Sequence, residues 1–173
     1  MAKKREHKFL SFVAIVIILV FAGAIFMVVS SGNPYKDTSS NQQSSNQTYK
    51  SKAMKFSINV PSKFHTLDQE DKTTLSDTNG NQINIIRNGT QFKNLSDYIT
   101  NFDERRKLTP TETRKLSIDG NEAMSRIATF PEENVTYKSY YIYAYNWVYV
   151  ISTSSEELFG DLDKIAQSFK YTP

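Results

Sequence analysis

The sequence predicts an α+β protein: a mostly antiparallel sheet of about six to seven strands, two amphipathic helices packed on it, and one preceding transmembrane helix. Three observations support this class. Residues 9–29 form an uncharged apolar run. Turn signals such as Asn-Gly and Asp-Gly join strand-like runs. Two later segments repeat apolar residues at the spacing of one helical face.

The apolar run extends from Phe9 to Val29 and contains no charged residue. As an α-helix it would be about 32 Å long, enough to cross a hydrocarbon core about 30 Å thick. We therefore predict a transmembrane helix at residues 9–30 that contacts the lipid bilayer through residues 9–29. Cleavage as a signal peptide at Ala22-Gly23-Ala24 is the alternative, although the apolar run continues past that point.

The net charge of +3 resides in the first eight residues, and the remainder carries equal numbers of basic and acidic residues. A basic tail before a membrane helix favours a cytoplasmic N-terminus. We therefore expect residues 1–8 in the cytoplasm and the C-terminal domain outside the cell membrane. The balanced charge of that domain argues against nucleic acid as a partner.

Residues 31–53 are expected to form a flexible polar linker. The stretch from Ser31 to Lys52 is rich in Ser, Asn, Gln and Thr and has no aliphatic residue to seed a core. The folded extracytoplasmic domain is therefore predicted at residues 54–173.

The first half of this domain is expected to hold three strands. Residues 54–60 (MKFSINV) alternate apolar and polar side chains and end at Pro61, which opens a loop to Leu67. Lys72–Asp77 and Gln82–Arg87 flank a Thr-Asn-Gly-Asn turn, a strong hairpin signal.

A helix is predicted after Asn94, whose side chain can cap it, with Asp97 in the first turn. Its apolar face would comprise Leu95, Tyr98, Ile99 and Phe102. The helix should fray near Leu108, because Pro110 disfavours helical backbone at Thr109.

The second half is expected to hold four strands, rich in β-branched and aromatic residues toward the end. They are predicted at Thr111–Ile118, Asn121–Phe130, Val135–Tyr145 and Trp147–Thr153. Asp119-Gly120 and the segment 131–134 form the first two turns between them.

The sequence then predicts a C-terminal helix. Ser154 and Glu157 match a capping box with Ser154 as the cap. The apolar face of this helix would comprise Leu158, Phe159, Leu162, Ile165, Ala166 and Phe169.

Four segments within residues 54–171 carry a resemblance to a known family: FSINVPSKF, NLSDYITNF, LSIDGNEAMSRIATF and YYIYAYNWVYVISTSSEELFGDLDKIAQSFK. In order and texture they resemble the PsbP-like family, including its bacterial DcrB-like relatives. The resemblance implies an antiparallel sheet between helical layers, an α/β/α sandwich, in a small extracytoplasmic or lumenal protein, often an accessory subunit of an assembly. This chain departs in having Phe64 and no tryptophan near the first strand, and in a transmembrane anchor instead of a lipid-anchored cysteine. No motif supports a role in photosynthesis.

Candidate catalytic residues are few. The chain has no cysteine, and of its two histidines only His65 falls in the predicted extracytoplasmic part, in an expected exposed loop. The carboxylate pairs fit turns, helix caps and solvated faces: Glu132-Glu133, Glu156-Glu157 and Asp161 with Asp163. Residues 68–71 lack the spaced pattern of a calcium loop. We therefore predict no catalytic, cofactor-binding or metal-binding residue and no cofactor.

Two segments are candidate binding surfaces. A basic cluster comprises Arg105, Arg106, Lys107, Arg114 and Lys115. It either complements a helix dipole or contacts anionic lipid, wall polymer or a protein. The aromatic run at 137–149 is expected to pack under a helix, with an exposed row that stacks sugars or docks a protein as the alternative.

These features favour a non-enzymatic, membrane-tethered binding or assembly module with a protein or surface-polymer partner. The alternative is a hydrolase acting on cell-surface polymers. Convergent titratable groups in a deep pocket would favour the enzyme, whereas an aromatic or basic surface patch would favour the binding module.

Overall fold

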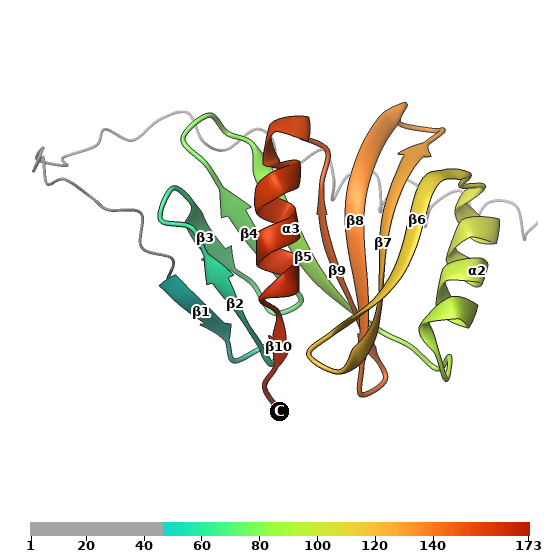
Figure 1. Cartoon of the computed structure of the whole chain (residues 1–173), viewed down its shortest axis with the longest axis horizontal. Coiled ribbons are helices and arrows are strands. Elements are labelled where there is room, and N and C mark those ends of the chain that lie inside the picture. Colours follow the sequence, from blue (N-terminus) through green and yellow to red (C-terminus); the bar gives the residue numbers. More distant parts are fainter. Residues whose placement is uncertain (1–46) are drawn as a thin grey trace, which may run out of the picture. The chain divides into compact units, whose positions relative to one another are not determined.

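The computed structural model describes residues 47–173, which form ten strands and two α-helices (Figure 1). The predicted cytoplasmic tail, the transmembrane helix at 9–30 and most of the linker lie outside the described residues. Within residues 47–173, neither α-helix has the length and apolar character needed to span a membrane.

Seven strands form one antiparallel sheet, as the sequence predicted. Their spatial order is β3 (His65–Asp68), β4 (Lys72–Ser76), β5 (Gln82–Gly89), β9 (Trp147–Thr153), β8 (Val135–Ala144), β7 (Asn121–Phe130) and β6 (Pro110–Ile118). Every pair of neighbours is antiparallel. Most neighbouring strands of the sheet are consecutive in the chain and are joined by short hairpins. The exception is the β5–β9 pair, whose two strands are separated in the chain by α2 and by β6 to β8.

The hairpin turns follow from local backbone chemistry. Asp119 and Gly120 have φ values of 52° and 74°, as a two-residue turn between right-twisted strands requires. Gly80, in the turn between β4 and β5, has φ 84°. Both turns were predicted. A third, at Tyr145 and Asn146, ends β8 one residue earlier than expected, with φ values of 51° and 63°. Tyrosine is a poor signal for such a turn, because its side chain disfavours positive φ.

One face of the seven-stranded sheet carries the main core. It is covered by α3 (Phe159–Gln167) and by a small antiparallel sheet of β1 (Gln47–Ser51), β2 (Phe56–Val60) and β10 (Lys170–Tyr171). The rings of Phe56, Tyr149 and Phe169 meet there at centroid separations of 4.9 to 6.1 Å. Tyr149 also donates a hydrogen bond to the Met54 carbonyl at 2.6 Å. Phe169 is therefore a core residue, as predicted, although it follows the end of α3 at Gln167 and does not lie on the helix.

Strand β1 corrects the predicted domain boundary. Residues up to 53 were expected to be flexible linker, but Gln47 to Ser51 pair in register with Val60 to Phe56. The Ser51 hydroxyl is buried and donates to Asp68 at 3.1 Å. An edge strand bonded to one neighbour needs few apolar side chains, so the polar sequence gave no signal for it.

Two further predictions near the strand ends were wrong. The segment at 61–67 was expected to be a loop, yet β3 begins at His65 and is exposed on both sides, which leaves no alternating pattern. The C-terminal helix does not use Ser154 as its cap. A 3-10 turn, η2 (Glu156–Leu158), precedes α3, and neither has a side-chain cap. Instead the Ser155 amide donates to the Thr153 hydroxyl at 3.1 Å.

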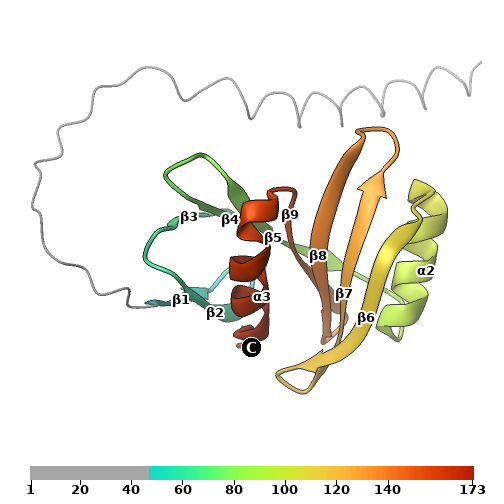
Figure 2. The ribbon, with the colours of Figure 1, turned by 45° about the horizontal axis from the view of Figure 1, so that its top comes forward.

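The opposite face of the sheet carries α2 (Leu95–Arg106). The Asn94 side chain accepts from the Asp97 amide at 2.8 Å, the predicted cap, and Glu122 of β7 accepts from the Leu95 amide at 3.0 Å. The helix ends at Lys107, which has φ 54°. Leu95 and Ile99 pack on Met124, Tyr141 and Val148 of the sheet. Figure 2 shows α2 and α3 well apart, with β6, β7 and β8 between them in the view.

Candidate binding groove

A groove of about 760 Å³ follows one side of α2. The end of β5 and the following loop, a stripe of α2, and the β7–β8 turn line it. These residues are Gly89, Thr90, Gln91, Phe92, Tyr98, Asn101, Phe102, Arg105, Arg106 and Glu132. The helical positions recur every three or four residues, so they share one side of α2. From Tyr98 to Arg106 the helix rises about 12 Å, which is the length of the helical wall of the groove.

Three aromatic rings form the apolar wall of the groove. Tyr98 and Phe102 lie nearly parallel, with an interplanar angle of 9° and centroids 6.3 Å apart. Phe92 meets Tyr98 edge-on at 6.4 Å. Phe102 is backed by Tyr141 and Phe130 at 6.2 and 6.4 Å. Because each ring rests on another, the wall is held in place before any ligand arrives.

The raised pKa values of Tyr98 and Tyr141 keep both side chains neutral at physiological pH. Burial raises the pKa of Tyr98, against the opposing effect of the hydrogen bond from Asn88, which lies 3.4 Å from the Tyr98 hydroxyl. Burial also raises the pKa of Tyr141 to about 12. These side chains therefore act as apolar rings with a hydroxyl group, and not as acids.

The loop from Gly89 to Phe92 is fixed to the β8–β9 hairpin. The Tyr143 hydroxyl donates to the Phe92 carbonyl at 2.9 Å, and the Thr90 amide donates to the Asn146 carbonyl at 3.0 Å. Gly89 lies against the Trp147 ring, where an added Cβ would come within 3.3 Å. The loop wall of the groove is thus set by bonds to the sheet.

Arg105 and Arg106 stand at the end of the groove near the C-terminus of α2. Both are exposed, and no carboxylate of the described residues lies within 4.0 Å of either. Arg126 on β7 differs sharply from these two arginines, since its side chain is only 2% exposed. Its Nη2 lies 2.7 Å from the carboxylate of Asp103 on α2. One arginine therefore fastens α2 to the sheet, while two others are available to an anion.

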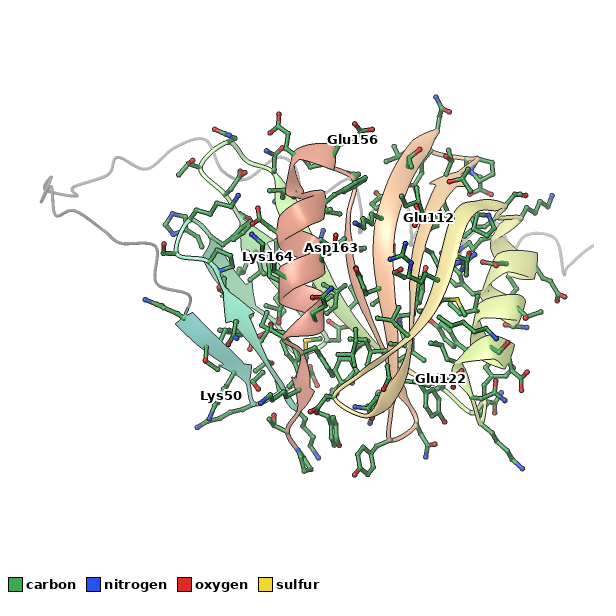
Figure 3. All side chains as sticks on the ribbon, in the orientation of Figure 1. Lys50, Glu112, Glu122, Glu156, Asp163 and Lys164 are labelled. Atoms are coloured by element: carbon green, nitrogen blue, oxygen red, sulfur yellow. The ribbon has the colours of Figure 1, made fainter. Side chains whose placement is uncertain are left out.

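The structure separates the predicted basic cluster. Arg105 and Arg106 line the groove, and Lys107 forms the C-cap of α2. Arg114 and Lys115 are neighbours on β6, so their side chains point to opposite faces of the sheet. Arg114 lies 3.8 Å from Glu112, which is labelled in Figure 3. Its charge favours the ionised form of Tyr140 on the α3 side of the sheet, against the larger effect of burial, which raises the pKa of that tyrosine.

The aromatic run at 137–149 mostly packs inside the fold, which agrees with the favoured interpretation. Tyr140, Tyr141 and Tyr149 are buried. Tyr140 faces α3, where its hydroxyl donates to Asp163 at 2.7 Å. Tyr145 is the exception: it is 72% exposed and stacks on Tyr171 with centroids 4.6 Å apart.

The candidate catalytic residues lie apart from the groove, except for Glu132. His65 is exposed on the edge strand β3. Asp163, labelled in Figure 3, accepts from Lys138 and Tyr140, and Asp68 accepts from Thr73 at 2.6 Å. Among residues 47–173, no three His, Asp or Glu side chains gather as a potential metal site.

Sequence reasoning found Arg105 and Arg106 through their charge, and Tyr98 and Phe102 through helical spacing. It missed Gln91, Asn101 and Glu132 as members of the same site. They come from three different segments, and only the tertiary fold brings those segments together.

The fold defines a class of protein: an antiparallel sheet with α3 and the small sheet on one face and α2 on the other. It is similar to the solution structure of cyanobacterial PsbP from a Synechocystis species, with a TM-score of 0.53 and 9% identity, covering 80% of this chain and 99% of that one. A crystal structure from Bacteroides thetaiotaomicron matches with a TM-score of 0.51 and 13% identity over 74% of this chain and 49% of that chain. The chain therefore has a PsbP-like fold, as the sequence resemblance implied.

No protein-family model and no curated protein matches the sequence.

Proposed function

We propose that this chain is a non-enzymatic binding or assembly module, tethered at the outer face of the cell membrane, that holds a protein or surface-polymer partner in the α2 groove. The observation that carries the proposal is the groove itself. Its aromatic wall and loop are fixed by contacts within the fold, and two exposed arginines at one end lack carboxylate partners within residues 47–173. Pre-positioned apolar surface with a few convergent polar groups is the usual make-up of a binding site.

The tether is part of the proposal. The uncharged run at residues 9–29 would anchor the chain in the bilayer, and the basic tail before it would stay in the cytoplasm. The groove would then face the extracytoplasmic space, where a partner protein or a surface polymer is within reach.

The non-enzymatic part of the proposal is supported by the bonds of the carboxylates. Asp68 accepts from Ser51 and Thr73, Asp163 accepts from Lys138 and Tyr140, and both ties hold strands and helices together. These groups have structural roles. Because His65 is exposed on the edge strand β3 and does not line the groove, His65→Ala should leave fold and partner binding unchanged. A loss of cellular function with stability intact would contradict the non-enzymatic assignment.

Site-specific photocrosslinking in intact cells tests the groove. A photoreactive amino acid replaces Gln91 or Asn101 in the full chain, and a matched control replaces Gln167, an exposed residue of α3. We expect crosslinked products of defined mass from the two groove positions and none from the control. Equal products from all three positions, or none from the groove, would refute the proposal.

A further inference from the structure

We propose, resting on the binding function above, that the α2 groove takes a linear glycan bearing carboxylate or phosphate groups. Three features of the groove point to this ligand: the length of its helical wall, its aromatic rings and the two arginines at one end.

The shape indicates a chain and not a compact molecule. The lining stripe of α2 runs about 12 Å from Tyr98 to Arg106. The lining also includes Gln91 on the loop before α2 and Glu132 on the β7–β8 turn. A ligand that touches all of these residues must be longer than a single sugar ring.

The aromatic wall suits sugar rings. Tyr98 and Phe102 both line the groove, and their rings lie within 9° of parallel with centroids 6.3 Å apart. The C–H face of a pyranose ring carries partial positive charge, which the negative face of an aromatic ring attracts. The partly exposed side chains of Tyr98 and Phe102 therefore offer apolar surface to the sugar units of a chain in the groove.

The arginines supply the preference for an anion. Arg105 and Arg106 are exposed and face no carboxylate within 4.0 Å among the described residues. A guanidinium group binds a carboxylate or a phosphate through two parallel hydrogen bonds. An acidic group on the glycan would therefore fix its position along the groove.

The remaining polar groups favour a glycan over an acidic peptide. Gln91 and Asn101 can both donate to and accept from hydroxyl groups, and Glu132 can accept from them. The walls also offer no free strand edge to pair with a peptide backbone, because the Thr90 amide is already bonded to Asn146 and the other wall is a helix.

The test is calorimetric titration of the full chain in a neutral detergent at low salt. The probes are hexagalacturonate, phosphorylated maltohexaose, uncharged maltohexaose and a hexaglutamate peptide. We expect at least one anionic glycan to bind ten times more tightly than both the uncharged glycan and the peptide. The stronger of the two identifies carboxylate or phosphate as the source of the charge.

Variants assign the binding to the groove. Arg105→Gln with Arg106→Gln should weaken binding of the anionic glycan about tenfold or more, since each charge-assisted contact contributes on the order of a tenfold change. Tyr98→Leu should weaken it as well. The matched control, Lys50→Gln with Lys164→Gln, removes the same charge from exposed positions on the other side of the fold (Figure 3) and should stay within twofold of the parent.

Several results would overturn the inference: no binding of either anionic glycan, equal binding of hexaglutamate, or equal loss in the lysine control. If crosslinking from Gln91 and Asn101 still yields a defined protein product in those cases, the groove is a binding site for a protein and the proposed function stands. If crosslinking fails too, the proposed function fails with the inference.

Discussion

The two faces of the seven-stranded sheet are built differently. The α3 face is closed by a helix and a second sheet, and its core contains fully buried aromatic and aliphatic side chains such as Phe56, Ile151 and Phe169. The α2 face has a smaller apolar cluster, a partly buried ion pair between Asp103 and Arg126, and a groove with half-buried rings.

This difference separates stability from binding. Apolar burial is the main stabilising contribution to a fold, so the α3 face should dominate the free energy of unfolding. The α2 face leaves aromatic rings and charged groups partly accessible, which costs stability but provides contacts for a partner.

The largest expected effect is a truncation on the α3 face. Phe169 is 1% exposed and touches the rings of Phe56 and Tyr149, so Phe169→Ala should lower the free energy of unfolding by about 3 to 5 kcal/mol. Phe102→Ala on the α2 face should cost less than half as much, because Phe102 is only partly buried. Urea unfolding, followed by the fluorescence of Trp147, the only tryptophan, measures the loss of stability in both variants. Equal losses would contradict the division of roles.

A smaller effect is expected from the ion pair that fastens α2. Asp103→Ala would leave Arg126 buried without a partner and should cost about 2 kcal/mol, less than a fully buried pair because Asp103 is partly exposed. Arg126→Met replaces the buried charge by an apolar chain of similar volume, so its cost should be within about 1 kcal/mol. Arg126 already has unpaired Nε and Nη1 groups. If Arg126→Met costs more than Asp103→Ala, the pair itself stabilises the fold.

The smallest expected effect is at alkaline pH. Burial raises the pKa of Tyr141 in the folded state to about 12, whereas an unfolded tyrosine has a pKa of about 10. Between these values the unfolded chain releases a proton that the folded chain retains, so stability falls as the pH rises.

By pH 11 this tyrosine should cost about 1 kcal/mol. Tyr141→Phe should therefore lose less stability than the parent protein between pH 9 and pH 11, by urea unfolding. An identical loss in both proteins would show that Tyr141 ionises as readily in the folded state as in the unfolded one.

The sequence predicts those parts of the fold whose signals are local. The Asn94 cap, the turns at Gly80 and Asp119-Gly120 and the apolar face around Leu162 all depend on a few neighbouring residues. Strand β1 and the exposed strand β3 were missed, because their pairing partners and not their own side chains hold them in place.

The groove was predictable only in fragments. Charge identifies Arg105 and Arg106, and helical spacing identifies Tyr98 and Phe102. Their joint position beside Gln91 and Glu132 depends on how α2 docks on β7 and β8, which the partly buried pair of Asp103 and Arg126 helps to fix. A single sequence contains no local signal for such a contact.

Hydrogen exchange of the full chain tests the central claim most directly, because it reports the two helices separately. If the α3 face holds the fold and the α2 face is stabilised separately, the amides of 99–105 in α2 should exchange at least ten times faster than those of 163–166 in α3 under native conditions. Equal rates in the two helices, both limited by global unfolding, would contradict the account.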